Sequence, residues 1–135
     1  MLVAAVTGPS NSGKSTLVAA LIRHFVTQGR TVGAIKHTHH ALNDQRRGDT
    51  ATFADAGAEP VIFAGDGEAV LFRSHRIERF PFRSTDELLA HFDTDIVFIE
   101  GFKGGGNWPR IELDGNKRIG PQEALVILDT IWREP

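Results

Sequence analysis

A glycine-bounded segment followed by lysine and serine constrains this chain more than any other feature. The segment consists of Gly8, Pro9, Ser10, Asn11, Ser12, Gly13, Lys14 and Ser15, and it fits the pattern Gly-x-x-x-x-Gly-Lys-Ser. The apolar run Leu2–Thr7 precedes it, and a helical pattern follows it. A glycine-rich turn between a buried strand and a helix presents successive backbone N–H groups to a phosphate chain. The pattern therefore predicts a phosphate-binding loop at the tip of the first strand.

Each residue type in this segment suits the binding of a nucleoside triphosphate. Gly8 and Gly13 supply the backbone freedom that a tight anion-binding turn needs. Lys14 is expected to reach the β- and γ-phosphates, and Ser15 to place its hydroxyl on Mg²⁺. Thr16 can add a hydroxyl near the α-phosphate, while the positive end of the following helix points at the anion. The whole stretch from Gly8 to Thr16 is therefore predicted to bind the nucleotide.

Hydrophobic periodicity predicts a strand on each side of a helix at the start of the chain. Leu17, Leu21 and Phe25 recur at every fourth position, as on the buried stripe of an amphipathic helix. Thr31–Lys36 has the composition of a second strand, and the order strand, helix, strand has the spacing of a parallel crossover unit. The chain is therefore predicted to have an α/β fold of the P-loop NTPase type, with three layers and a mostly parallel sheet.

A hairpin in the middle of the chain is predicted to add antiparallel strands. Pro60–Ala64 and Glu68–Arg73 are apolar runs, and the turn-forming sequence Gly65-Asp66-Gly67 separates them. Thr50–Ala56, before the hairpin, is a short helix candidate. The sheet is therefore expected to be mixed.

Further elements are predicted in the second half of the chain. Ser84, followed three residues later by Glu87, forms a capping box at the start of a third helix. Asp95–Glu100 has the pattern of a buried strand, with Asp95 capping its start and Glu100 at its end. Arg110–Leu113 and Leu125–Leu128 have the composition of late strands. No closing helix is expected.

Length and composition limit the organisation and the partners of the chain. With 135 residues, the chain is long enough for one domain. Its net charge of −2 gives no broad attraction to nucleic acids or anionic membranes, so a phosphate ligand would be held locally. No apolar run approaches the roughly 20 residues needed to span a bilayer, and no basic leader marks a signal peptide. Because the chain also lacks cysteine, a cytoplasmic protein without nucleic-acid or membrane partners is expected.

Two acids are predicted to complete a magnesium site beside the phosphate-binding loop. Glu100 ends a buried strand, where P-loop proteins usually hold the water shell of the metal ion with a carboxylate. Asp49 follows a polar loop and is expected to hold Mg²⁺ or orient water, to cap the helix that begins there, or to do both. Ser15, Asp49 and Glu100 form the predicted metal site, and Lys14, Asp49 and Glu100 form the predicted catalytic set. The alternative for Glu100 is a solvated acid at the end of a strand.

A basic and histidine-rich run, Lys36-His37-Thr38-His39-His40, follows the second strand. Ligands of α/β proteins bind beyond the carboxyl ends of parallel strands, so this run is expected to face the phosphate-binding loop. Lys36 and His37 are predicted to contact the nucleotide, with Lys36 neutralising charge that develops during phosphoryl transfer. The histidines bind a transition metal, contact phosphate or, in the case of His39 and His40, are simply solvated.

Several of these segments together resemble the molybdopterin-guanine dinucleotide biosynthesis protein B (MobB) family. The resemblance is carried by Gly8–Thr16, Lys36–His40, Gly48–Thr50, Ala56–Ala58 and Glu100–Lys103, in this order along nearly the whole chain. The Lys-His-x-His-His and Glu-Gly-Phe-Lys runs are its distinctive parts. It implies a Mg²⁺-dependent GTP-binding protein with weak GTPase activity. It also implies a homodimer formed through the sheet, which assists the guanylyltransferase that attaches GMP to molybdopterin.

The chain departs from the family pattern in three respects. Thr50 and the run Ala51–Phe53 stand where the family often has a serine and then a basic residue. The run Asn116–Ile119 is the nearest match to the Asn-Lys-x-Asp element that selects guanine in many GTPases, but it lacks the acid. A preference for guanine therefore rests on the resemblance alone. Family members also tend to be longer, so a reduced or truncated version is expected.

Two other functions are compatible with the same phosphate-binding loop. A small-molecule kinase would use the glycine-rich loop around Lys103 as a lid over an acceptor hydroxyl. A nucleotide-controlled metal or cofactor carrier would use His37, His39 and His40 as ligands. A stable zinc site, however, requires three or four ligands in fixed geometry, which a single loop run rarely provides.

Overall fold

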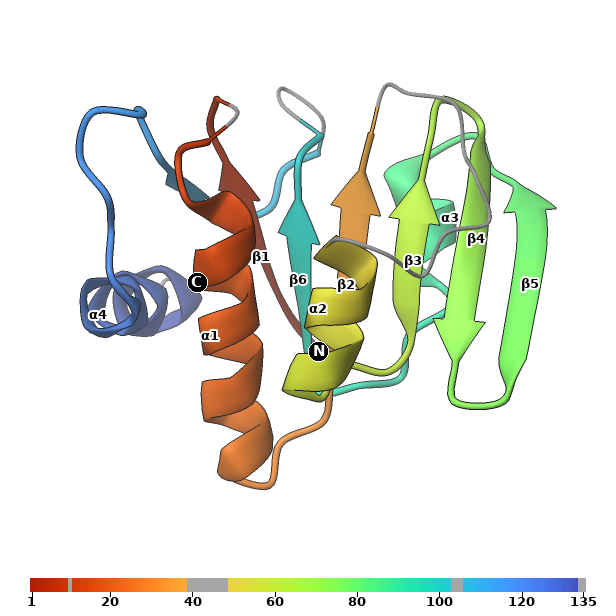
Figure 1. Cartoon of the computed structure of the whole chain (residues 1–135), viewed down its shortest axis with the longest axis horizontal. Helices are drawn as coiled ribbons and strands as arrows, with labels where there is room; N and C mark the ends of the chain where they lie inside the picture. The colour runs from red at the N-terminus through yellow and green to blue at the C-terminus, as the bar shows by residue number, and fades with distance from the viewer. Residues whose placement is uncertain (10, 39–48, 103–105, 134–135) are drawn as a thin grey trace.

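The computed structural model describes residues 1–9, 11–38, 49–102 and 106–133 (Figure 1). In chain order its elements are β1 (Leu2–Thr7), α1 (Lys14–Thr27), β2 (Val32–His37), α2 (Asp49–Ala56), β3 (Val61–Ala64), β4 (Glu68–Arg73), β5 (Arg76–Pro81), α3 (Thr85–Leu89), β6 (Ile96–Glu100), β7 (Arg110–Glu112) and α4 (Pro121–Arg133). No helix within these ranges is long and apolar enough to cross a membrane.

The strands form one mixed sheet in the order β5-β4-β3-β2-β6-β1-β7. The pairs β1–β6, β1–β7, β2–β3 and β2–β6 are parallel, whereas β3–β4 and β4–β5 are antiparallel. The carboxyl ends of β1, β2, β3 and β6 therefore lie at one edge of the sheet, at the top of Figure 1. We refer to this edge as the carboxyl edge. The mostly parallel sheet and its antiparallel hairpin confirm the predicted fold class.

Alternating side chains along the central strands pack into two separate cores. On β6, Ile96 and Phe98 join the core beneath α1, whereas Val97 and Ile99 join the core beneath α3. Burial on both sides explains why these strands lack polar residues until their carboxyl ends, where Thr7, Lys36, His37 and Glu100 lie. Figure 1 shows α1 and α2 in front of the sheet, α4 beside α1, and α3 behind the sheet. We call the two sides of the sheet the α1 face and the α3 face. The helices on each face and the sheet between them form the predicted three layers.

The chain closes with α4, so the prediction of a strand at Leu125–Leu128 and of no closing helix is wrong. The run is apolar at every position, and in a short window that pattern also fits a buried strand. In the structure, Ala124 and Leu128 are buried while Val126, between them, is 68% exposed. Buried residues that are four positions apart, with an exposed residue between them, are typical of a helix. Trp132 also anchors the helix, because its indole N–H donates to the carbonyl of Val3 (3.1 Å).

The edge strand β5 was not predicted from the sequence. It is rich in charged residues and mostly exposed, and it pairs with β4 on only one side. An edge strand buries little, so it lacks the alternating pattern by which a strand is found in a sequence. The helix start at Ser84, by contrast, is confirmed, although the Glu87 carboxylate accepts from the N–H of Arg83 (2.8 Å) and not, as in a full capping box, from that of Ser84. Glu87 N–H donates to the side chain of Ser84 at the start of α3.

Candidate functional site

The loop between β1 and α1 lies at the carboxyl edge and leaves the start of α1 without a side-chain cap. Gly13 is the N-cap residue, with φ of 93° and ψ of 13°, a left-handed conformation that favours glycine. No acidic residue occurs in the first turn. The first N–H groups of a helix need partners, and together with the helix dipole they attract anions. The start of α1 thus has the local structure of an anion-binding site.

The side chain of Lys14 folds back over this loop. Its ammonium group donates a hydrogen bond to the carbonyl of Gly8 at 2.6 Å. The bond links the first residue of α1 to the first residue of the loop and so holds the positive charge over the loop. The lysine is therefore positioned beside the uncapped helix start, as its predicted role in phosphate binding requires.

Glu100, at the end of β6, is the most buried charged group of the site. It is 1% exposed, and β6 lies between β1 and β2 in the sheet. The Ser15 hydroxyl donates to its Oε2 at 3.0 Å, and the Lys36 ammonium forms an ion pair with its Oε1. A buried carboxylate requires such partners, because its transfer from water is costly. The structure thus brings together three predicted residues from α1, β2 and β6.

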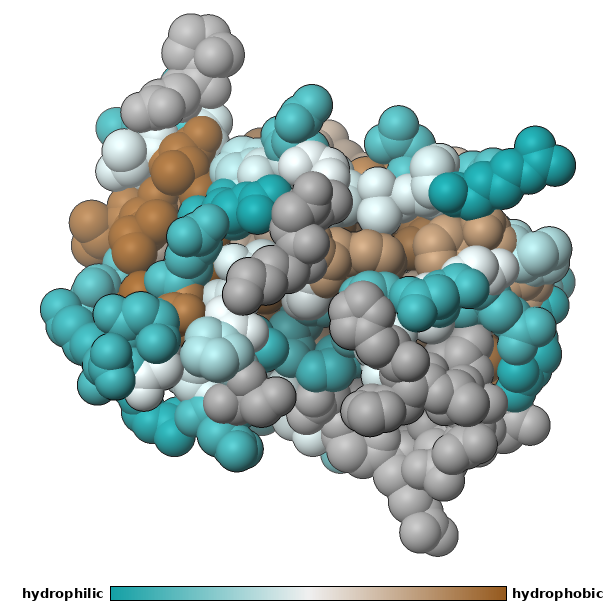
Figure 2. All heavy atoms as spheres, turned by 90° about the horizontal axis from the view of Figure 1, so that it is seen from above, coloured by the Kyte–Doolittle hydropathy of each residue, from teal (hydrophilic) through white to brown (hydrophobic). Residues whose placement is uncertain are grey.

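These side chains line a cavity of about 430 Å³ at the carboxyl edge. It is lined by Asn11, Gly13, Lys14, Ser15, Thr16, Lys36, Glu100 and Arg118. Three of these residues carry positive charge and one carries negative charge, so the cavity suits an anionic ligand. Figure 2, which views the molecule from above and so onto this edge, shows hydrophilic side chains beside hydrophobic ones that gather over α4.

His37 follows Lys36 on β2 but lies on the α3 face, away from this cavity. Its ring stacks on Phe102, with centroids 4.0 Å apart and planes 19° apart. Its Nε2 lies 3.2 Å from Oδ1 of Asp66, in the β3–β4 turn. Successive side chains of a strand point to opposite faces, so Lys36 and His37 do not reach the same site.

Several predicted residues lie outside the described ranges. Ser10, His39, His40 and Lys103 are among them. Asp49 is the first residue of α2, but its side chain is not described. Within the ranges that are described, no group of three His, Cys, Asp or Glu side chains could hold a metal ion.

Arg118 is a residue of the cavity that the sequence did not predict. Asp114 begins the turn before it, and its Oδ1 accepts hydrogen bonds from the N–H groups of Asn116 (2.8 Å) and Lys117 (3.0 Å). The bonds from Lys117 and Asn116 hold the pKa of Asp114 below its ordinary value. The turn places Arg118 so close to the loop that a Cβ on Gly13 would lie 2.5 Å from the guanidinium Nη1. Only the Asp-Gly-Asn turn is visible in the sequence, and its approach to Gly13 depends on the fold.

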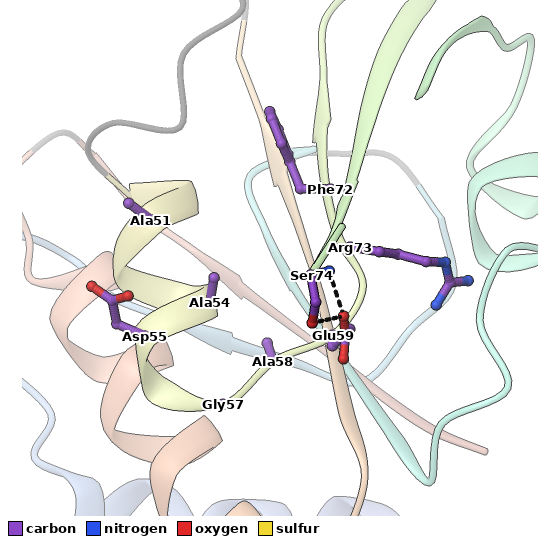
Figure 3. A pocket seen from close by; sticks show the side chains of 9 residues that line it. All are labelled: Ala51, Ala54, Asp55, Gly57, Ala58, Glu59, Phe72, Arg73 and Ser74. Atoms are coloured by element: carbon purple, nitrogen blue, oxygen red, sulfur yellow. Dashed lines mark hydrogen bonds between the residues drawn. The ribbon is translucent and has the colours of Figure 1, made fainter. Parts of the chain in front are cut away.

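A slightly larger hollow, of about 460 Å³, lies between α2 and the β3–β4 hairpin (Figure 3). Its charged residues are Asp55, Glu59 and Arg73, so it has no excess of positive charge. Glu59 accepts bonds from the side chain and the backbone N–H of Ser74, both at 2.6 Å, and these bonds lower its pKa. This hollow therefore lacks the features of a phosphate site.

The fold and the loop together define the class of protein. A mostly parallel sheet, a glycine-bounded loop between β1 and α1, and a buried acid at the end of an adjacent strand are typical of α/β proteins of the P-loop class. A sequence profile of the family "Molybdopterin guanine dinucleotide synthesis protein B" (MobB) matches residues 3–130. The chain belongs to this family.

Individual relatives agree with this assignment. The chain is 37% identical over 103 residues to the molybdopterin-guanine dinucleotide biosynthesis adapter protein of Haemophilus influenzae, covering 73% of this chain and 55% of that protein. It is 29% identical over 133 residues to a probable adapter protein of the same name from Bacillus subtilis, covering 96% and 75%. The chain thus spans about half the length of the Haemophilus relative.

Solved structures show the same fold. The crystal structure of Bacillus subtilis MobB matches with a TM-score of 0.53 and 22% identity, over 89% of this chain and 76% of that one. A MobB homologue from Bacillus stearothermophilus matches with a TM-score of 0.52 and 22% identity, over 84% and 64%. At this identity the likeness concerns the fold alone.

Proposed function

We propose that this chain binds GTP with Mg²⁺ at the β1–α1 loop, hydrolyses it slowly, and acts as an accessory protein in molybdopterin guanine dinucleotide synthesis. One observation supports the nucleotide site most strongly. The side chains of Ser15, Lys36 and Glu100 meet beside the start of α1, which has no side-chain cap and over which Lys14 folds back. Membership of the MobB family supports the role in synthesis. The choice of guanine rests on the family, because none of the described residues that line the cavity is an exposed acid that would bind the base.

The donor set suits a magnesium ion. Ser15 and Glu100 offer a hydroxyl and a carboxylate, the oxygen donors that Mg²⁺ prefers. When bound there, Mg²⁺ would neutralise negative charge on the β- and γ-phosphates. We propose Asp49, the first residue of α2, as the third residue of the metal site. The loop also contains the Ser12 hydroxyl, which is buried and has no hydrogen-bond partner among the described residues, as expected of a loop that holds a polar ligand.

The remaining side chains would hold the nucleotide and the attacking water. Lys14 would exchange its bond to the Gly8 carbonyl for phosphate oxygens. Lys36 balances the charge of Glu100 and lies on the cavity wall, from which its ammonium group can reach the terminal phosphate. Asp49 or Glu100 would orient water in line with that phosphate. Turnover is expected to be slow, as the resemblance to the MobB family implies.

The proposed partners follow from the family and from the shape of the sheet. Two relatives are named adapter proteins of molybdopterin-guanine dinucleotide biosynthesis, so we propose molybdopterin or its guanylyltransferase as the partner, in the cytoplasm. We also propose a homodimer formed through the sheet, by pairing of the outer strand β5. This strand has a neighbour on only one side, and its Ile77 is 50% exposed. Sedimentation velocity at several concentrations tests the dimer, and a monomer throughout would contradict it.

Replacing Lys14 tests the nucleotide site. Lys14→Ala is expected to lower GTP affinity, measured by calorimetry with Mg²⁺, by about 100-fold, because it removes a charge-assisted contact to two phosphates. Arg23→Ala is the matched control, since it removes a cation from an exposed position on the same helix. Equal GTP affinity for wild type and Lys14→Ala would overturn the proposal.

The fate of the γ-phosphate distinguishes hydrolysis from transfer to an acceptor. With GTP labelled at the γ-phosphate, the proposal expects label only in free phosphate. Label in an organic product would instead indicate a small-molecule kinase. Omission of Mg²⁺ is expected to stop phosphate release, and release that continues in the presence of EDTA would contradict the role of the metal.

A further inference from the structure

Arg118 is placed over the start of α1 by a segment far away in the sequence. The guanidinium lies against Gly13, where a Cβ would come within 2.5 Å of Nη1 and 3.6 Å of the guanidinium carbon. Any side chain at position 13 would therefore displace the arginine. The guanidinium thus lies against the helix N-cap residue, next to the uncapped N–H groups of the first turn.

The three cations of the cavity differ in how their charge is used. Lys14 donates to the Gly8 carbonyl, and Lys36 is paired with Glu100. Arg118 has no hydrogen-bond or ion-pair partner among the residues that the structure describes, and its side chain is exposed. Five N–H donors in a rigid fork are thus available to a ligand in the cavity.

A smaller hollow beside the 430 Å³ cavity shows which end of the ligand Arg118 would meet. This hollow, of about 210 Å³, is lined by Ser12, Gly13, Thr16, Leu17, Ala20, Arg118, Ile119, Gly120 and Pro121. Arg118, Gly13 and Thr16 line both hollows, whereas Lys36 and Glu100 line only the first. Arg118 therefore lies at the end of the 430 Å³ cavity that is away from Glu100. We refer to this cavity as the phosphate cavity. The adjoining hollow is mostly apolar, as suits a nucleoside.

We infer that Arg118 binds the α- and β-phosphates of a bound nucleoside di- or triphosphate. Its side chain would lie over the point where the α-phosphate joins the nucleoside. The inference rests on the proposed nucleotide binding. Lys14 would then contact the β- and γ-phosphates and Lys36 the γ-phosphate, while Arg118 contacts the α- and β-phosphates. A guanidinium suits this place because its fork contacts two phosphate oxygens at once. GDP and GTP should therefore depend on Arg118 to the same extent.

Calorimetric titration of GTP and of GDP, each with Mg²⁺, tests this assignment on four proteins: wild type, Arg118→Ala, Arg118→Lys and Lys117→Ala. Arg118→Ala is expected to weaken both nucleotides by the same factor, about tenfold, from the loss of charge-assisted hydrogen bonds. Arg118→Lys keeps the charge but not the fork, so it should fall between wild type and Arg118→Ala. Lys117→Ala removes a neighbouring charge whose ammonium lies 4.0 Å from Glu123, outside the cavity, and should change affinity less than twofold.

The outcomes separate this inference from the proposed function. Loss with GTP but not with GDP would place the guanidinium at the γ-phosphate and overturn the assignment. Equal losses in Arg118→Ala and Lys117→Ala would show a general effect of charge and also overturn it. Unchanged binding by Arg118→Ala, combined with lost binding by Lys14→Ala, would overturn this inference alone. Failure of the wild-type protein to bind either nucleotide would overturn both.

Discussion

The carboxyl ends of β2 and β6 place different chemistry on the two faces of the sheet. On the α1 face, Lys36 from β2 and the buried Glu100 from β6 form an ion pair beside the β1–α1 loop. On the α3 face, His37 from β2 stacks on Phe102, which follows β6. Phe102 in turn packs edge-on against Trp108. One face is charged and suits an anion, whereas the other is aromatic and packs against the core.

The two strands place their charged and aromatic side chains on opposite faces in different ways. On β2, ordinary alternation separates Lys36 from His37. On β6, Glu100 and Phe102 are two residues apart and would share a face if the strand continued. Gly101 and Phe102 adopt φ values of 101° and 54°, and this turn carries Phe102 to the α3 face. Adjacent residues can therefore be changed to test each face separately.

The largest expected effect comes from breaking the ion pair on the α1 face. Lys36→Met keeps the length of the side chain but leaves Glu100 without its cation, in a position that is 1% exposed. Removing one partner of a buried pair is expected to lower the free energy of unfolding by about 3 kcal/mol. Urea-induced unfolding measures this loss. In the double variant Lys36→Met/Glu100→Gln, which removes both charges, most of the stability should return. A double variant as unstable as Lys36→Met would show that the pair is not the cause.

The next effect tests the turn that separates the faces. Gly101→Ala places a Cβ 3.0 Å from the Cβ of His37, at a φ of 101°. Backbone strain and close contact together are expected to cost about 2 kcal/mol of unfolding free energy. Gly67→Ala is a matched control, because Gly67 has a φ of 106° and no atom within 4 Å of the added Cβ. The control should lose about 1 kcal/mol from strain alone, and an equal loss in both variants would contradict the role of the His37 contact.

Local rules explain how much of the fold could be predicted. β1, the loop after it, α1 and the buried strand ending at Glu100 follow from apolar runs, glycine positions and helical period, all visible within short windows. The final helix was missed because the window considered was too short. Leu125–Leu128 is apolar throughout, and the helical period appears only when Ala124, Leu128 and Trp132 are taken together.

The site was predictable where it depends on strand ends and not where it depends on distant loops. Glu100 could be placed near Ser15 because the carboxyl ends of parallel strands share one edge. Arg118 could not, since its approach to Gly13 depends on the path of the chain from β7 to α4. The position of His37 is a different case: the alternation of a strand already separates it from Lys36, so the sequence contained the signal.

A smaller effect is expected on the α3 face. His37→Ala removes a stacked aromatic pair and should lower the free energy of unfolding by about 1 kcal/mol. GTP affinity should not change, because His37 does not line the phosphate cavity. Urea unfolding and calorimetry on the same protein samples measure both quantities. A tenfold loss of GTP affinity without further loss of stability would show that the two faces are not independent.

The smallest effect concerns Asp95, the acid that directly precedes the strand carrying Glu100. Asp95, before β6, accepts a hydrogen bond from the backbone N–H of Thr31 at 2.9 Å and so links β6 to β2 at the opposite edge, as its predicted capping role requires. This bond lowers the pKa of Asp95 from its usual 3.8, with smaller contributions from the Thr31 hydroxyl and Arg30. A carboxyl with a lowered folded-state pKa stabilises the protein above its unfolded pKa and loses that contribution as pH falls through the folded value.

Asp95→Asn should therefore be slightly less stable than wild type at pH 7, and the difference should disappear in acid, where the wild-type carboxyl is protonated as well. Thermal unfolding between pH 7 and pH 3 measures this difference. GTP affinity should be unchanged, because Asp95 lies at the edge of the sheet remote from Lys14 and Glu100. If the stability difference grew as the pH fell, the carboxylate would not be the stabilising form. The hydrogen bond that the Asp95 carboxylate accepts from Thr31 would then not stabilise this end of the sheet.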